Sequence, residues 1–500
     1  MIGFKGWRAS RLRLRAGLTT LSPRQLAGME AEVMERLRSV KDDLVNADLP
    51  SLGRIKNLVI GADHKVSCDL ETPSTALPQN EHWLAQATAS IKALPWVQEV
   101  RVSLTPVSTR NPQAPRHSAL AHVSNIIAVS SCKGGVGKST VAVNLAFALQ
   151  KRGARVGLLD ADVYGPSLPT MISPDDRAIR RSKVNPSFVE PVTYHGVECM
   201  SFGFVNSKAA PGAGGKGAAV MRGAMVSKVI DQLVLGTEWG ALDYLVIDMP
   251  PGTGDIHMSL AQQMAITTAV IVTTPQKLRF VAVGPSAASE SSTSFVDVEK
   301  GISMFEDLKI PTSAVVENMS YFDCAHGHRH YPFGHGHLKA LQQSFDIQHT
   351  FQFPMAESTS DSADAGRPLV LTDALPEVSA TFDALAITVA EECVKLKHLS
   401  KLAPELLYDA TRGIVLRFYS TESAQEVVLS PVDLRAQCRC AACIEEFTGK
   451  ALLDPSTIPD DVRPTAVQRK GNYAFAVVWS DGHSSSLYTF EHLRRLAQAV

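Results

Sequence analysis

The N-terminal part of the chain alternates between helix-like and strand-like spacing of its apolar residues. Met34, Leu37, Val40 and Leu44 recur at helical spacing and predict a first helix. The later segments are two strand-like runs, Ile55–Ile60 and Lys65–Leu70, a second helix over Trp83–Ile91, and an alternating strand over Val97–Leu104. This order predicts a small α+β domain over residues 29–107.

From residue 122 to residue 400, short and continuously apolar runs alternate with helical segments. The runs are Ile126–Ser130, Val156–Asp160, Tyr244–Asp248, Ala269–Thr273 and Thr312–Glu317. Runs that are apolar on both faces are typical of parallel strands covered by helices on both sides. The sequence therefore predicts a larger α/β domain with a parallel sheet. Two Gly/Ser-rich stretches within it, Lys208–Ala219 and Gly284–Ser294, are expected to be surface loops.

Three further segments lie outside these two domains. The polar, proline-bearing residues 108–121 predict a linker, and residues 405–500 have short strand-like runs around a cysteine cluster, which predicts a third, mainly-β domain. Residues 1–28 carry one lysine, five arginines and no acidic residue. Such a composition is typical of an organelle transit peptide, and a disordered basic tail is the alternative.

Composition narrows the class of protein. The 500 residues are 45% hydrophobic and 20% charged, with a formal net charge of −1. These values are typical of a soluble chain with several domains. A nucleic-acid partner is not expected without a basic excess. No apolar run approaches the roughly 20 residues that span a bilayer, so stable membrane insertion is not expected either.

A glycine-rich segment stands between the first predicted strand of the α/β domain and a predicted helix over Val141–Gln150. In Ser131–Thr140, glycines would let the backbone turn its N–H groups toward phosphates at the positive end of that helix. This context predicts a P-loop that binds ATP. Lys138 is expected to bridge the β- and γ-phosphates, and the Ser139 hydroxyl to bind Mg²⁺. The expected nucleotide-binding residues are Gly134, Gly135, Val136, Gly137, Lys138, Ser139 and Thr140.

Lys133 stands directly before the glycines and resembles the signature lysine of the deviant Walker A class of P-loop NTPases, which is SIMIBI- and MinD-like. The resemblance implies that this lysine reaches the nucleotide of a partner chain, and therefore that the protein is a homodimer. Cys132 replaces the usual first glycine of the motif. A small structural thiol and a thiol that senses or carries a cluster are both open interpretations.

Three carboxylates and one amide follow in the order of that class. Asp160 and Asp162 end one predicted strand and match the class's first switch, where Asp162 orients the attacking water and Asp160 lies near the metal. Asp248 ends another apolar strand and matches the Walker B aspartate, which holds Mg²⁺ through water. Asn318 matches the position that contacts the adenine base. The resemblance thus implies that Lys133, Lys138 and Asp162 are catalytic.

The longer motifs resemble the Mrp family within this class. They are Asp162–Pro169, Asp248–Asp255, Thr273–Gln276 and Val316–Phe322. The domain before the ATPase resembles an iron–sulfur assembly domain, and the whole layout is similar to the plant high-chlorophyll-fluorescence type of scaffold. The resemblance implies slow ATP hydrolysis linked to assembly of [4Fe–4S] clusters and their delivery from cluster donors to apoproteins. It also implies a location in the plastid stroma, with the mitochondrial matrix as the alternative.

Two departures from the family pattern concern cysteines. Most Mrp relatives carry Cys-x-x-Cys at the position of Cys324, so that a dimer supplies four thiolates, but Gly327 stands in place of the second cysteine. A mixed site with nearby histidines such as His326 is one possibility. A histidine-rich surface loop is the other. The second departure is in Glu71–Pro78, which lacks the cysteine that assembly domains often carry after Thr-Pro.

Three cysteines of the C-terminal domain, Cys438, Cys440 and Cys443, lie within six residues. Three thiolates need a fourth ligand for a tetrahedral ion. This segment, together with Val478–Tyr488, resembles the N-terminal domain of γ-butyrobetaine hydroxylases, which implies that His483 completes a closed Cys₃His site. Structural Zn²⁺, an iron–sulfur cluster and unliganded thiols are the three alternatives.

Two other functions compete with a cluster carrier. A MinD-type ATP switch for spatial organisation would need a membrane-binding helix, for which Phe490–Val500 is the weak candidate. A zinc-stabilised interaction scaffold would have a vestigial ATPase. The intact lysines and aspartates of the P-loop domain argue against that scaffold.

Overall fold

The protein is described by a computed structural model. It describes residues 22–107, 118–183, 185–205, 223–252, 257, 260, 264–276, 293–336, 338–345, 347–401, 404–419, 424–440, 442–444, 450, 452–470 and 474–498. These residues divide into two compact units. One contains the described residues up to Thr72 together with Gln79–Pro106, and the other contains Pro73–Pro78 together with the described residues from Val107 onward.

The first unit has a three-stranded sheet with two main helices. Its elements are α1 (Pro23–Leu37), β1 (Lys41–Asp42), β2 (Ala47–Asp48), β3 (Ile55–Ile60), β4 (Lys65–Thr72), α2 (Gln79–Lys92) and β5 (Glu99–Pro106). The sheet order is β3-β4-β5, with β3 antiparallel and β5 parallel to β4. Trp83 and Ile91 of α2 are buried in its core. The predicted α+β order is present, and α1 extends across the predicted boundary at residue 28.

The first helix is shorter than its apolar spacing predicts. Helix α1 ends at Leu37, and the prediction that Val40 and Leu44 continue it is wrong. Asp42 instead accepts a hydrogen bond from the backbone N–H of Leu44 at 2.9 Å and pairs with the buried Arg54. This local side-chain bond competes with helical backbone bonding, and residues 41–48 form the β1–β2 ribbon.

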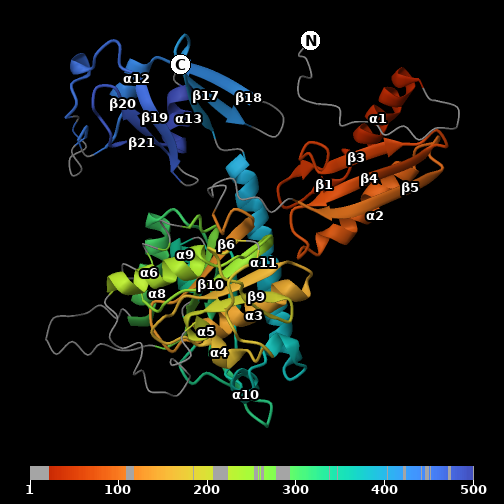
Figure 1. Ribbon diagram of the computed structural model, residues 1–500, viewed down its shortest axis with the longest axis vertical. Helices are drawn as coiled ribbons and strands as arrows, with labels where there is room; N and C mark the ends of the chain where they lie inside the picture. The colour runs from red at the N-terminus through yellow and green to blue at the C-terminus, as the bar shows by residue number, and fades with distance from the viewer. Residues whose placement is uncertain are drawn as a thin grey trace. The chain divides into compact units, whose positions relative to one another are not determined.

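The second unit contains an eight-stranded sheet (Figure 1). Its strands are β6 (Val123–Ser130), β7 (Val156–Asp160), β8 (Val192–Tyr194), β9 (Val197–Ser201), β10 (Leu242–Asp248), β11 (Thr268–Thr273), β12 (Thr312–Glu317) and β15 (Thr350–Gln352). The order is β15-β12-β11-β6-β10-β7-β9-β8, and all neighbouring pairs are parallel except β8 with β9. The five predicted strands form the centre of this sheet, so the predicted α/β class is confirmed.

Helices cover the sheet on two faces, as the apolar runs require. They are α3 (Lys138–Lys151), α4 (Leu168–Met171), α5 (Phe202–Val205), α6 (Gly223–Leu235), α8 (Thr293–Asp307), α9 (Leu338–Phe345), α10 (Glu357–Asp364) and α11 (Pro376–Lys401). One core cluster joins α6 and α8 to alternate strand positions such as Ile126, Ala128 and Ile247. Helix α3 packs on β7 and β10, and α11 packs on α3 and β12. Of the two predicted Gly/Ser-rich loops, Lys208–Ala219 lies outside the described residues, and Gly284–Ser294 enters them only where α8 begins.

The C-terminal residues form two three-stranded antiparallel sheets around their own core. The elements are β16 (Glu405–Asp409), β17 (Gly413–Tyr419), β18 (Ala424–Leu429), α12 (Pro431–Ala436), β19 (Pro464–Lys470), β20 (Ala474–Trp479), β21 (Ser486–Thr489) and α13 (Phe490–Gln498). Phe490 and Leu493 of α13 are buried in this core beside Trp479 and Tyr488. In the described part of the chain, every helix is too short or too polar to cross a membrane.

Candidate functional site

The P-loop joins the carboxyl end of β6 to the first residue of α3. Gly135 and Gly137 have φ angles of 76° and 82°, a left-handed backbone that glycine adopts without strain. A side chain at Gly137 would also collide with the amide of Asn318. Because Lys138 opens α3 directly after this turn, free N–H groups and the helix dipole meet at one point. The local geometry is that of a phosphate-binding loop.

Lys138 and Asp248 meet at the base of this loop. The Lys138 ammonium donates to the Asp248 carboxylate, and both side chains are buried. Burial raises the pKa of Asp248, and burial together with the neighbouring Asp248 raises the pKa of Asp160 to about 7. Two carboxyl groups buried close together favour a bound cation. The predicted Mg²⁺ residues are therefore gathered where a divalent ion would relieve their repulsion.

Backbone and hydroxyl donors fix the two aspartates that follow β7. Asp160 accepts from the N–H of Asp162 and of Leu168, each at 3.1 Å, and from the Ser201 hydroxyl at 3.0 Å. Asp162 accepts from the N–H of Gly165 at 3.1 Å. Ser201 is a site residue that sequence reasoning missed, because it ends β9, a short strand that the apolar pattern did not reveal.

The side chain of Lys133 is directed into the interior of its own chain. Its Nζ is buried and has no hydrogen-bond partner among the described residues, and the same is true of the Ser167 hydroxyl. A buried, unpaired ammonium is costly, so an anion that reached it would be favoured. These orphaned groups, the buried carboxylates and the glycine turn together fit a nucleotide with Mg²⁺.

Asn318 lies against the P-loop. Its side-chain amide donates to the carbonyl of Val136 at 2.9 Å, and its backbone N–H donates to the carbonyl of Thr273 at 2.8 Å. The residue therefore links the ends of β11 and β12 to the P-loop. The contact of Asn318 with the adenine base stays a prediction.

Cys132 lies close to helix α8. A Cβ added to Gly301 of α8 would stand 2.5 Å from its sulfur. The thiol therefore occupies the space that the missing side chain of Gly301 leaves. This contact supports the structural interpretation of Cys132.

A buried histidine near the P-loop was also missed by sequence reasoning. His257 is 2% exposed and hydrogen-bonds to the backbone carbonyl of Pro250, and its Nε2 has no hydrogen-bond partner among the residues that the structure describes. Burial lowers the pKa of this imidazole to about 4. It is therefore neutral at physiological pH. The sequence offered no signal for it, since an isolated histidine between apolar residues has no characteristic pattern.

Cys324 lies in a short hairpin formed by β13 (Phe322–Asp323) and β14 (Arg329–His330). A hydrogen bond from His330, with backbone N–H groups, holds the pKa of the Cys324 thiol below its usual range. A thiolate is the form that binds metal. Within the residues described, however, the hairpin histidines do not gather with Cys324 into a set of three metal ligands.

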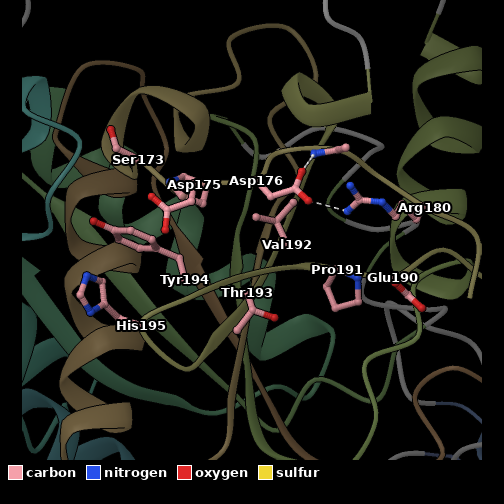
Figure 2. Close-up of a pocket in the computed structure, with 12 residues that line it drawn as sticks. Ser173, Asp175, Asp176, Arg180, Glu190, Pro191, Val192, Thr193, Tyr194 and His195 are labelled. Carbon is pink, nitrogen blue, oxygen red and sulfur yellow. Dashed lines mark hydrogen bonds and ion pairs between the residues drawn. The ribbon is translucent and has the colours of Figure 1, made fainter.

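A separate cavity of about 610 Å³ lies beside the edge strand β8 (Figure 2). Asp176 in its lining is already engaged by Arg180 at 2.6 Å and by the N–H of Ala178 at 2.9 Å. The Tyr194 hydroxyl donates to the carbonyl of Gly366 at 3.2 Å. None of the predicted site residues lines this cavity.

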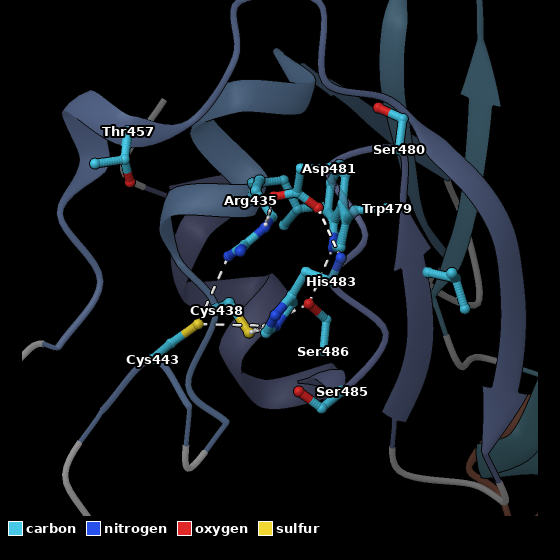
Figure 3. A network of polar contacts seen from close by, with 12 residues as sticks. Arg435, Cys438, Cys443, Thr457, Trp479, Ser480, Asp481, His483, Ser485 and Ser486 are labelled. Atoms are coloured by element: carbon cyan, nitrogen blue, oxygen red, sulfur yellow. Dashed lines mark hydrogen bonds and ion pairs between the residues drawn. The ribbon is translucent and has the colours of Figure 1, made fainter.

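The predicted metal ligands of the C-terminal domain converge (Figure 3). His483 Nε2 lies 3.4 Å from the sulfurs of Cys438 and Cys440 and 3.7 Å from that of Cys443. The four ligand atoms lie within 4.8 Å of one another. Burial lowers the pKa of His483, which keeps its ring neutral and able to offer a lone pair. Burial raises the pKa of Cys443 to about 11.

These distances fit one tetrahedral ion. Zinc–sulfur and zinc–nitrogen bonds of about 2.3 and 2.05 Å at the tetrahedral angle place sulfur and nitrogen about 3.5 Å apart. In a [4Fe–4S] cluster each thiolate binds a different iron, so its ligand atoms must stand farther apart. The donor set and its spacing therefore suit a single Zn²⁺-like ion better than a cluster.

Comparison with known proteins covers all three parts of the chain. Residues 122–390 match the NUBPL iron-transfer P-loop NTPase family, residues 30–104 match an iron–sulfur cluster assembly protein family, and residues 411–494 match the N-terminal region of γ-butyrobetaine hydroxylase-like proteins.

Relatives align over most of the chain's length. The chloroplastic Fe-S cluster assembly factor HCF101 of Oryza sativa subsp. japonica is 42% identical over 503 residues, covering 99% of this chain and 89% of the relative. The protein of that name from Arabidopsis thaliana is 41% identical, covering 94% and 83%. An iron-sulfur cluster carrier protein of Haemophilus influenzae is 35% identical, covering 75% and 95%. The resemblance inferred from the motifs is confirmed, and the chain belongs to the NUBPL iron-transfer P-loop NTPase family.

Proposed function

We propose that this protein is an ATP-dependent scaffold that carries [4Fe–4S] clusters and delivers them to apoproteins. The observation that carries the proposal is the 42% identity to a chloroplastic Fe-S cluster assembly factor across 99% of the chain. All three parts of the chain take part in that alignment. The shared activity is therefore expected of the whole protein and not of the ATPase domain alone.

ATP supplies the conformational change in this proposal. Lys138, Ser139 and the two buried aspartates bind Mg²⁺ and the phosphates, and Asp162 orients the attacking water. Lys133 leaves its buried position and contacts the nucleotide of a second copy, so that two chains close around ATP as a homodimer. The buried Nζ of Lys133, which has no hydrogen-bond partner in the described part of its own chain, supports this role.

Cys324 is the proposed contact for the cargo. Its lowered pKa favours the thiolate, and its hairpin is exposed. One chain offers a single thiolate here, so a cluster would be held between the hairpins of two copies, with histidines or exogenous thiols as further ligands. The Cys₃His site of the C-terminal domain then holds a resident Zn²⁺, because its ligand spacing suits one ion.

The proposed location is the plastid stroma. Both plant relatives above are chloroplastic proteins, which favours the plastid over the mitochondrial matrix. The membrane-bound switch is not favoured, since α13 buries Phe490 and Leu493 in the core of its own domain.

Anaerobic reconstitution with iron and sulfide tests the function and the choice of cysteine together. The full-length chain should acquire a cluster with [4Fe–4S] absorption and Mössbauer signatures and transfer it to an apoprotein. Cys324→Ser should lose the cluster and keep zinc, whereas Cys440→Ser should lose zinc. A chain that takes up no stoichiometric cluster would reject the proposal, and retention of the cluster by Cys324→Ser would reject this cysteine as its ligand.

A further inference from the structure

A buried arginine reaches the ligand set of the C-terminal site. Arg435 of α12 is 5% exposed, and its neighbour Leu434 belongs to the same domain core as Cys438 and Cys443. A buried guanidinium is costly unless anions pair with it. Arg435 has two such partners: its Nε donates to Asp481 Oδ2 at 2.8 Å, and its Nη1 points at the sulfur of Cys443 at 3.6 Å (Figure 3).

Asp481 connects this arginine to the fourth ligand. While Oδ2 accepts from Arg435, Oδ1 accepts from the backbone N–H of His483 at 2.9 Å. One carboxylate therefore fixes both the guanidinium and the turn that carries the histidine. The carbonyl of His483 in turn accepts from the N–H of Trp479 at 2.9 Å, which ties the turn to β20.

The other two sulfurs have neutral neighbours. The Ser485 hydroxyl donates to Cys440 Sγ at 3.3 Å, and the Ser486 hydroxyl lies 3.2 Å from Cys438 Sγ. Trp479 Nε1 donates to the Ser486 oxygen at 3.0 Å and leaves its hydroxyl proton free to point at the sulfur. Among these contacts, only the one from Arg435 carries a charge, and charged donors make the stronger bonds.

Charge explains why an arginine stands at this place. Three thiolates around a divalent ion leave one negative charge, and the carboxylate of Asp481 adds another in a largely buried site. Arg435 neutralises one of these two charges. Without it, the sulfur of Cys443 would lose its charged hydrogen-bond donor, and Asp481 would lose the partner that fixes it beside His483.

We propose that Arg435 is a positioning residue that retains the metal ion of the Cys438, Cys440, Cys443 and His483 site, through its N–H bond to Cys443 and through Asp481. This inference rests on the proposed zinc site. The arginine makes the ion a permanent part of the domain and keeps it out of exchange with the iron–sulfur cargo.

The test compares full-length wild type with Arg435→Met and with Arg439→Met. Arg439 lies between two ligands in sequence and is exposed, so its variant removes an equal charge without the buried contact. Zinc release to a chromogenic chelator should be about 10–100-fold faster in Arg435→Met, the range found for partners of metal ligands. Arg439→Met should release zinc at the wild-type rate.

Cobalt substitution separates this role from simple packing. In the Co²⁺-loaded protein, loss of the N–H bond to sulfur should move the thiolate-to-cobalt charge-transfer band to lower energy, because the sulfur lone pair is no longer stabilised. An unchanged band together with an unchanged release rate in Arg435→Met would overturn the inference. If Arg435→Met does not fold, Arg435→Lys decides, since lysine keeps the charge but cannot make both contacts; wild-type behaviour of that variant would overturn the inference.

The outcomes also distinguish this inference from the proposal on which it rests. Wild type without a stoichiometric ion would reject the zinc site itself. Wild type with one ion per chain, and an Arg435→Met variant that keeps it equally well, would reject only the role of Arg435.

Discussion

Lys138 and Asp248, which are 110 residues apart in sequence, form a buried ion pair at the base of the P-loop. The pair holds the predicted phosphate-binding lysine and the predicted Walker B carboxylate together. We expect a nucleotide with Mg²⁺ to break this ion pair, because the ammonium would then bind the phosphates and the carboxylate would bind the metal.

Replacement of Lys138 should therefore greatly weaken nucleotide binding. Lys138→Ala removes the charged donor to the phosphates, and we expect an affinity loss of about 100-fold, or roughly 3 kcal/mol. Calorimetric titration with Mg²⁺ and ATP measures it. Lys183→Ala, at an exposed lysine of the same domain, should bind as wild type does. Wild-type affinity in Lys138→Ala would show that this loop does not hold the triphosphate.

Replacement of Lys133 should have a different effect. Because its Nζ has no hydrogen-bond partner in the part of the chain that the structure describes, Lys133→Ala should bind ATP within a few-fold of wild type but fail to form the closed dimer. Light scattering with a non-hydrolysable ATP analogue and Mg²⁺ gives the mass of the species. A wild-type protein that remains monomeric under these conditions, or a Lys133→Ala variant that dimerises normally, would contradict the trans role of this lysine.

The neutral His257 predicts a pH dependence of stability. Its pKa is lowered to about 4 in the folded chain, against an ordinary value near 6.5. Below about pH 6.5, His257 binds a proton in the unfolded chain but stays neutral in the folded chain. The free energy of unfolding therefore falls as the pH is lowered from 6.5 toward 4. The full effect is about 3 kcal/mol. Urea unfolding at about pH 5 and about pH 7.5 measures this loss.

His257→Gln is the matched control for that measurement, since it keeps a polar side chain without titrating in this range. The difference in unfolding free energy between the two pH values should be smaller in the variant by about 1–2 kcal/mol. An equal difference in variant and wild type would mean that other groups cause the pH dependence.

Gly301 and Cys132 predict an interaction between helix α8 and the P-loop. Alanine in place of a helical glycine normally stabilises by about 1 kcal/mol, but Gly301→Ala should destabilise the domain by about 1–3 kcal/mol because its methyl would overlap the Cys132 sulfur. The double variant Gly301→Ala with Cys132→Ala should regain wild-type stability or exceed it. Thermal unfolding measures the stability of both variants, and ATP titration measures whether the P-loop is affected. A stabilised single variant would show that the sulfur does not occupy this space.

Loss of one zinc ligand should leave the nucleotide site intact. Cys440→Ser breaks the Cys₃His set, and we expect zinc content to fall below half of the wild-type value while ATP affinity stays within about twofold. Metal analysis of anaerobically purified protein and the ATP titration above give the two values. If ATP binding were lost as well, the two sites would depend on each other.

Much of the candidate site could be predicted because its signals are local. The P-loop is one unbroken stretch between β6 and α3, and the apolar runs mark the central strands directly. Short strands were harder to predict. Both β9 and β15 lie toward the edges of the sheet with mixed composition, so Ser201, which donates to Asp160, carried no signal. The apolar spacing alone predicts a longer α1, but the helix ends at Leu37 and Asp42 forms a turn after it.

The sequence by itself determined the class of protein: glycines and a lysine between strand and helix specify a phosphate loop, and three cysteines within six residues specify a metal ligand set. Only the tertiary structure decided what surrounds these groups. In the tertiary structure, Arg435 contacts Cys443, the Nζ of Lys133 is buried, and the sulfur of Cys132 lies close to Gly301. The physical reason is that each of these contacts depends on packing between separate elements, and neither residue type nor spacing along the chain encodes which side chains meet across a core.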